Sequence, residues 1–131
     1  SQGSGTSGGV TVDTLLSSNL IEAPGYLHTS DERLKENISP ITNALAKVKA
    51  LKGVFFNFKD RPGRKTGLNA QNVEAIMPEV VATGQDGLKS VEYDSLVGLL
   101  IEAIKEQQIE IEKLQQIMAQ QDSQPGEKTS P

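Results

Sequence analysis

The stretch of residues 94–121, DSLVGLLIEAIKEQQIEIEKLQQIMAQQ, has the strongest helical pattern in the chain. Its side chains follow a heptad spacing with two core positions in every seven residues. The first core position holds Val97, Ile104, Ile111 and Met118. The second alternates leucine with glutamine: Leu100, Gln107, Leu114 and Gln121. Glutamine weakens such a seam but is tolerated where the stripe packs on partner helices. We therefore expect a long C-terminal helix, N-capped by Asp94, that takes part in self-association.

A shorter helix is predicted over residues 40–52. Ser39 suits the N-cap, Pro40 suits the first helical position, and Gly53 suits the C-terminal end. The following residues 54–58, VFFNF, are β-branched and aromatic, which favours a strand.

The middle of the chain alternates short elements. Residues 67–81 predict a short strand that leads into a short helix ending before Pro78. Residues 80–81 and 88–93 flank a turn that contains two glycines, which predicts a hairpin. Strands and helices mixed in this way predict an α+β fold, a small domain that ends in the long helix.

The composition bounds the size and the class of the protein. The 131 residues suffice for one small domain, and the net charge of −4 argues against nucleic-acid binding. The absence of cysteine excludes disulfides and thiol nucleophiles, and a single histidine excludes a two-histidine zinc motif. We expect no metal, no cofactor and no membrane span. Only 36% of residues are apolar, so we expect part of the apolar surface to be buried against other chains.

Both ends of the chain have a biased composition. Residues 1–9, SQGSGTSGG, cannot form a core, and the sequence begins at Ser1 rather than methionine. We expect these residues to be either a flexible lead or the tail of an upstream fibrous part, and the chain to be a fragment of a larger protein. The polar residues 122–131 contain two prolines and are expected to be disordered.

Few residues could carry chemistry in this sequence. The lone histidine, His28, lies too close in sequence to Ser30 for an ordinary serine–histidine–aspartate triad. A serine–lysine pair remains, and residues 30–37, SDERLKEN, hold Ser30 and Lys35 with Arg33 between them. A lysine base must lose its proton, which burial or a neighbouring cation promotes. The alternative is a solvated, charged loop, and the carboxylates in this run fit that alternative.

Several separate motifs resemble one known family. Residues 30–38, SDERLKENI, resemble the motif SDxRLKxxI that opens the C-terminal intramolecular chaperone domain of phage tail fibres, tailspikes, endosialidases and neck appendages. Further similar stretches follow in order: GVFFNF (53–58), GLNAQNVE (67–74), PEVV (78–81) and KSVEYDSLVGLLIEAIKE (89–106). One departure is Asn69, which stands where the family commonly has an apolar residue in GLIAQ.

The resemblance implies a homotrimer that helps an upstream fibre to fold and then cuts itself off. It implies that residues 1–29 end a fibrous β stalk and that residues 30–121 form the self-cleaving chaperone domain, with its long helix over 94–121. The partners would be two further copies of the chain and its own upstream fibre. The domain would act in the host cytoplasm during virion assembly, and the mature fibre would remain in the virion tail.

The resemblance also assigns the site. Ser30 would be the nucleophile and Lys35 the base, and the Thr29–Ser30 bond would be cut. The neighbouring Ser30–Asp31 bond is the second choice. Asp31 and Arg33 would orient the loop or lower the pKa of the lysine.

Two other functions remain open from the residues. A purely structural trimerisation module would share the fold and leave Ser30 and Lys35 inert. A coiled-coil adaptor that binds a partner helix would be monomeric or mixed in state when isolated.

Overall fold

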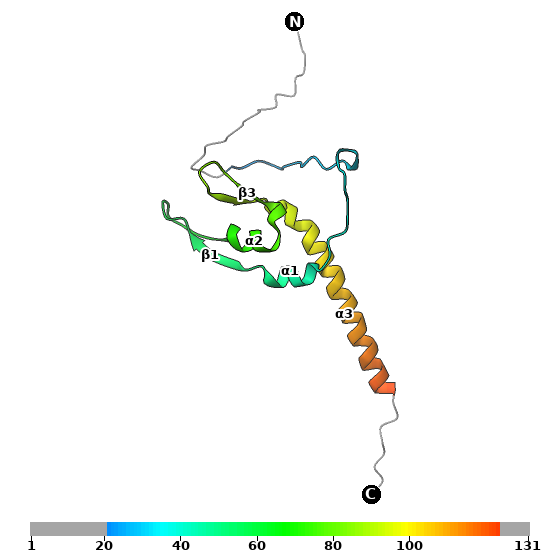
Figure 1. Cartoon of the computed structure of the whole chain (residues 1–131). Coiled ribbons are helices and arrows are strands. Elements are labelled where there is room, and N and C mark those ends of the chain that lie inside the picture. The colour runs from blue at the N-terminus through cyan, green and yellow to red at the C-terminus, as the bar shows by residue number, and fades with distance from the viewer. Residues whose placement is uncertain (1–20, 124–131) are drawn as a thin grey trace. The chain divides into compact units, whose positions relative to one another are not determined.

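The long C-terminal helix α3 organises the part of the chain that follows Ser39. The computed structural model describes residues 21–123, and the chain divides into two units between Ile38 and Ser39. The first unit contains a single-turn 3₁₀ helix, η1. The elements of both units, in chain order, are η1 (Glu32–Leu34), α1 (Ala44–Ala50), β1 (Gly53–Asn57), β2 (Arg64–Leu68), α2 (Ala70–Ile76), η2 (Pro78–Val80), β3 (Val81–Thr83), β4 (Lys89–Val91), η3 (Tyr93–Leu96) and α3 (Val97–Ser123). This mixture confirms the predicted α+β class (Figure 1).

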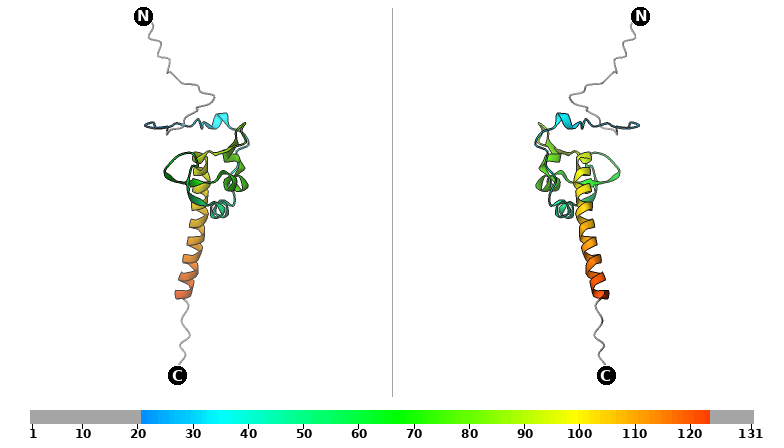
Figure 2. Two further views of the ribbon diagram at one scale, coloured as in Figure 1. Left: turned by 90° about the vertical axis from the view of Figure 1, so that its left-hand side faces the viewer. Right: turned by 90° about the vertical axis from the view of Figure 1, so that its right-hand side faces the viewer.

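The core of the second unit lies between the N-terminal turns of α3 and the elements that pack on them. Leu99 on α3 and Val73 on α2 are fully buried. Ala44 on α1 and Ala103 on α3 are also buried. Their small side chains allow the two helices to approach closely, since no bulky group stands between the backbones. Beyond this core, α3 extends past α1 (Figure 2).

The strands form two separate hairpins. Strands β1 and β2 pair antiparallel, from Gly53 opposite Leu68 to Asn57 opposite Arg64. Strands β3 and β4 pair antiparallel around a turn in which Gly87 has a φ of +79°, a conformation that glycine adopts without strain. The strand predicted at 54–58, the short helix before Pro78 and the second hairpin are therefore confirmed.

The start of α1 differs from the prediction. The helix begins at Ala44, not at Pro40, and its N-cap is Asn43 in a left-handed conformation. The Asn43 side chain makes no capping hydrogen bond. Instead, the Glu106 carboxylate on α3 accepts hydrogen bonds from the backbone amides of Ala44 and Leu45. The N-terminal end of α1 is therefore fixed by Glu106, which lies 62 positions after Ala44 and 61 positions after Leu45 in the sequence.

The start of α3 also differs. Asp94 lies inside η3 and not at an N-cap, and the Asp94 carbonyl accepts a hydrogen bond from the Val97 amide. The 3₁₀ turn thus provides backbone acceptors for amides that an N-cap side chain would otherwise bind. At the other end α3 continues to Ser123. The expectations for residues 1–20 and 124–131 lie outside the described residues.

The Glu106 contact gives a prediction about stability. Replacing Glu106 by glutamine leaves one acceptor oxygen where two backbone amides need partners. We expect the free energy of unfolding to fall by about 1–2 kcal/mol. The matched control is Glu110→Gln, which changes an exposed side chain one turn further along α3. This variant should change the free energy of unfolding by less than about 0.5 kcal/mol. Urea unfolding of the two variants at one protein concentration makes the comparison, and equal midpoints would contradict the capping role.

Candidate active site

Ser30 and Lys35 lie in contact in the first unit. The Lys35 ammonium Nζ donates a hydrogen bond to the Ser30 hydroxyl Oγ over 2.7 Å. Both side chains are exposed. This is the distance over which a base can take the proton of a nucleophile, once the lysine is neutral.

The local sequence explains why these side chains meet. Asp31 caps η1, because its carboxylate accepts a hydrogen bond from the Arg33 amide over 2.9 Å. The turn is closed by the Lys35 amide, which donates to the Glu32 carbonyl. A single 3₁₀ turn between Ser30 and Lys35 reverses the chain enough for the long lysine side chain to reach the serine.

Asp31 and Arg33 form an ion pair within the same turn. The Arg33 guanidinium donates to both Asp31 oxygens, with Nε–Oδ1 at 3.0 Å and Nη2–Oδ2 at 2.8 Å. These side-chain hydrogen bonds, together with the Arg33 amide, lower the pKa of Asp31, and the carboxylate raises the pKa of Arg33. The Arg33 charge is therefore compensated by Asp31. Both roles expected for these two residues, orienting the loop and lowering the pKa of the lysine, stay predictions.

Ser30 and the residues on both sides of it, Thr29 and Asp31, are exposed. Thr29 is exposed and precedes the η1 turn in irregular backbone. Glu32 and Glu36 are also exposed, which agrees with the expectation of a solvated charged run. Among residues 21–123, no group of three or more His, Asp or Glu side chains could hold a metal ion. Within the same range, no helix is long and apolar enough to cross a membrane.

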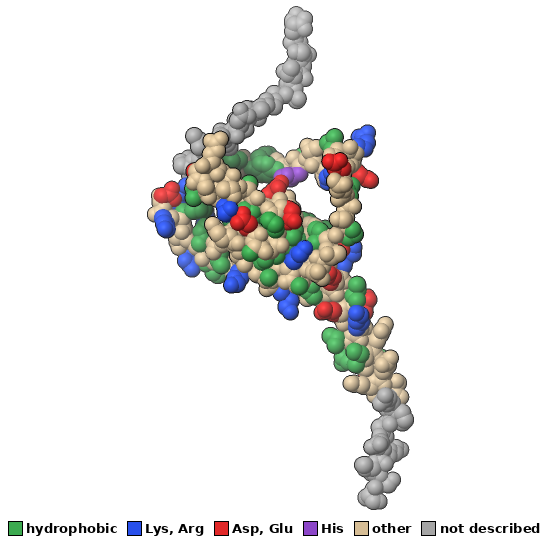
Figure 3. All heavy atoms as spheres, viewed as in Figure 1, with side chains coloured by type: hydrophobic (Ala, Val, Ile, Leu, Met, Phe, Trp, Pro, Cys, Tyr) green, Lys and Arg blue, Asp and Glu red, His purple; other side chains and the backbone are tan. Residues whose placement is uncertain are grey.

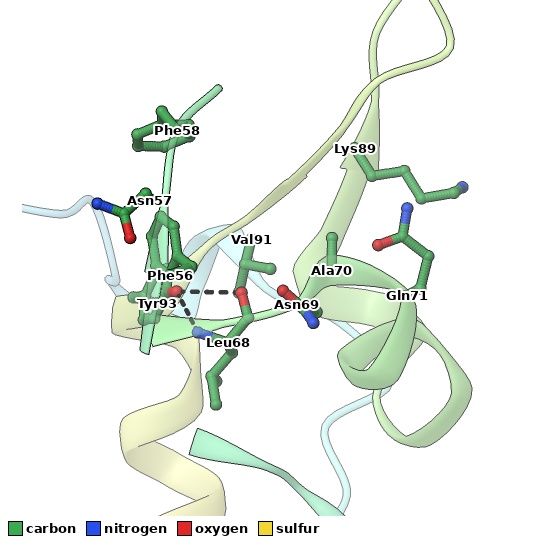
Figure 4. A pocket seen from close by; sticks show the side chains of 10 residues that line it. All are labelled: Phe56, Asn57, Phe58, Leu68, Asn69, Ala70, Gln71, Lys89, Val91 and Tyr93. Carbon is green, nitrogen blue, oxygen red and sulfur yellow. Dashed lines mark hydrogen bonds between the residues drawn. The ribbon is translucent and has the colours of Figure 1, made fainter. Parts of the chain in front are cut away.

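A separate cavity lies in the second unit and is lined by residues of β1, β2, α2 and β4. Its volume is about 410 Å³, and Tyr93, Asn69 and Lys89 are among its lining residues (Figure 4). The Leu68 amide donates to the Tyr93 hydroxyl over 2.8 Å, which fixes the ring at one side of the cavity. Asn69, the departure from the family pattern, is exposed here. A polar side chain at this position therefore keeps its contact with water and imposes no burial cost on the fold.

Comparison with known proteins finds a matching family model and similar tail fibre proteins. Residues 30–82 match a peptidase family model described as "Chaperone of endosialidase". The match begins at Ser30 and ends within strand β3. Two long tail fibre proteins, both named Gp37, from Enterobacteria phages K3 and T2, are each 33% identical to the chain over 104 residues. The alignment covers 72% of this chain and 8% of each relative, so the chain spans only a small part of their length.

Proposed function

We propose that this chain is the chaperone segment of a phage tail fibre, which joins three copies, supports folding of the upstream fibre and then releases itself. The self-cleavage rests on one observation, the 2.7 Å contact between Lys35 Nζ and Ser30 Oγ. The fibre context is supported by the family match and by the tail fibre relatives. After the cut the fibre stays in the virion tail, while residues 30–131 are released in the host cytoplasm.

The cut proceeds in two steps. The neutral Lys35 amine takes the Ser30 hydroxyl proton as Oγ attacks the Thr29 carbonyl carbon. The carbon–nitrogen bond breaks, the Ser30 nitrogen receives the proton, and Thr29 is held as an ester on Oγ. Water then hydrolyses the ester, which leaves a carboxylate on Thr29 and restores the Ser30 hydroxyl. Because nucleophile and bond belong to one chain, positioning supplies much of the rate.

The trimer is supported by the exposed stripe of α3. The apolar residues at the heptad core positions are all exposed in the single chain: Val97, Leu100, Ile104, Ile111, Leu114 and Met118. A soluble helix rarely leaves so long an apolar stripe in water, and burial of this stripe against two further copies removes it from solvent.

We expect cleavage to follow assembly. Ser30 and Lys35 are both exposed in the single chain. A lysine acts as a base only in its neutral form, and a partner chain that covers the site would favour that form. Assembly before cleavage also suits the folding of the fibre. A fibre that loses its chaperone segment only after it has folded is locked kinetically in the folded state.

The intact mass of the denatured, freshly expressed chain tests the proposal. A fragment that starts at Ser30 supports the assigned bond, and a fragment that starts at Asp31 keeps the pair but moves the bond. A stable trimer of full mass contradicts self-cleavage. A single monomer at micromolar concentration, measured by analytical ultracentrifugation, contradicts the trimer.

A non-cleaving trimerisation module is the second candidate. The observation that favours it is the exposure of Ser30 and Lys35, because the pair lies in contact with solvent rather than in an enclosed active site. This candidate predicts a trimer of full mass whose amount does not change when Ser30 is replaced.

A further inference from the structure

Charge is unevenly distributed over the second unit. Residues 47–65, which span most of α1 and the β1–β2 hairpin, contain seven lysines and arginines and one acid, Asp60. Residues 74–94, which include the β3–β4 hairpin, contain five acids and one lysine, Lys89. The first stretch therefore has a net charge of +6 and the second a net charge of −4, so the two are opposite in sign.

The positive charges gather on the surface of one edge. Figure 3 shows Lys and Arg side chains in a row along the edge formed by α1 and the β1–β2 hairpin. Six of the seven cations in residues 47–65 are exposed, and we call four of them, Lys49, Lys52, Arg64 and Lys65, the basic strip. Among residues 21–123, none of these four cations forms an ion pair with an acid of the same chain. The strip therefore presents uncompensated charge.

An apolar residue extends the basic strip on the outer face of the β1–β2 hairpin. Phe55 is 69% exposed, and the Arg64 guanidinium lies 5.5 Å from the centre of its ring. A phenyl ring that remains in water on a sheet face, with a cation stacked on it, is typical of a surface that another molecule covers.

The acidic stretch offers the complementary charge. We call Glu79, Asp86 and Glu92 the acidic surface, and all three are exposed. In residues 21–123 none of the three pairs with a lysine or arginine, whereas Glu74 is already paired with Lys89 at 2.8 Å. The Glu92 amide donates to the Val80 carbonyl, which brings the chain at Glu92 beside the chain at Glu79.

We infer that the basic strip of one copy docks on the acidic surface of the next copy in the trimer. This inference rests on the proposed trimer and names a second contact, separate from the α3 stripe. Two different surfaces on one chain that complement each other make a head-to-tail contact, and such contacts close into a ring when the rotation is 120°. Each copy then uses its strip once and its acidic surface once. Opposite charges also disfavour wrong partners and set the register of the three chains.

A charge-exchange experiment tests the inference on the full chain. Lys52→Glu with Lys65→Glu reverses part of the strip, and Glu79→Lys with Glu92→Lys reverses part of the acidic surface. We expect each pair to raise the protein concentration for half-assembly about tenfold, and the four changes together to restore it to within about threefold. Wild-type assembly should also weaken between 50 and 500 mM NaCl.

The control and the contrary outcomes separate this inference from the proposed function. Lys113→Glu reverses an exposed charge outside both surfaces and should leave assembly unchanged. If the variants with either pair of reversals still form the trimer, or if the four changes together do not restore assembly, the docking is overturned. The proposed trimer then stands. Reversal of the strip that abolishes binding to heparin, with the trimer unaffected, overturns it in favour of a polyanion surface. A monomeric wild type overturns both proposals.

Discussion

Replacing Ser30 by alanine is expected to leave the chain at full mass, with no fragment that starts at residue 30. The substitution removes the hydroxyl oxygen that attacks the Thr29 carbonyl, and a methyl group cannot form the ester. Because Ser30 is exposed and the contact that it loses is on the surface, we expect little change in the free energy of unfolding. Intact mass after a fixed time of expression, beside the wild type, measures the loss.

Replacing Lys35 by alanine is expected to slow cleavage by about 10²–10⁴-fold, the usual contribution of a positioned general base. Lys35→Arg makes the test sharper. Arginine keeps the positive charge and can still donate a hydrogen bond to Ser30, but it does not lose its proton in proteins. If Lys35 acts as a base, the arginine variant fails like the alanine variant. If Lys35 only holds the loop in place, arginine restores cleavage.

Matched controls isolate the pair from general effects of substitution. Ser39→Ala and Lys113→Ala remove one exposed serine and one exposed lysine away from the η1 turn. Both variants should be cut at the wild-type rate. Cleavage that persists in Ser30→Ala would place the nucleophile elsewhere, and loss of cleavage in the controls would mean that the site is not limited to Ser30 and Lys35.

The sequence predicted helices, strands and turns well where the residues of the element itself determine its structure. The two hairpins contain turn glycines, and the left-handed conformation of Gly87 is the reason why such a residue is needed there. The strand at 53–57 follows from β-branched and aromatic residues. The length of α3 follows from a continuous heptad pattern without proline or a central glycine.

The start of α1 could not be predicted from its own residues. Ser39 and Pro40 form a good local start signal, yet the helix begins at Ala44 because the Glu106 carboxylate binds its first amides. This acceptor comes from α3, so the choice is made by tertiary packing. A signal did exist: Glu106 lies three and seven residues after the buried Ala103 and Leu99, on the face of α3 that packs inward.

The candidate site too was predicted only in part from the sequence. Spacing alone made Ser30 and Lys35 an ordinary pair, and the resemblance supplied their roles. The geometry adds the reason why they meet, which is the turn that Asp31 caps. The capping preference of aspartate two residues before Arg33 was a readable sign of this turn.

Removing residues 105–131, or placing a charge in the α3 stripe, is expected to abolish the trimer. Ile104 is 64% exposed, and burial of such a side chain contributes about 2 kcal/mol. Three copies of Ile104→Asp therefore lose about 6 kcal/mol, which lowers the association constant for the trimer by about 10⁴. Burying three carboxylates together at the seam would weaken assembly further.

The chain offers a matched control on the same helix. Ile109 is 52% exposed, and it lies on the opposite side of α3 from the heptad stripe. Ile109→Asp makes the same chemical change at similar exposure and should keep the trimer, as sedimentation velocity at micromolar concentration can measure. Equal loss of the trimer in both variants would mean that any charge on α3 disrupts the helix. A trimer that persists in Ile104→Asp and in the truncated chain would show that α3 does not drive assembly. Selective loss in Ile104→Asp assigns assembly to the stripe itself, because both variants introduce the same charge on α3 and only Ile104 lies at a heptad core position.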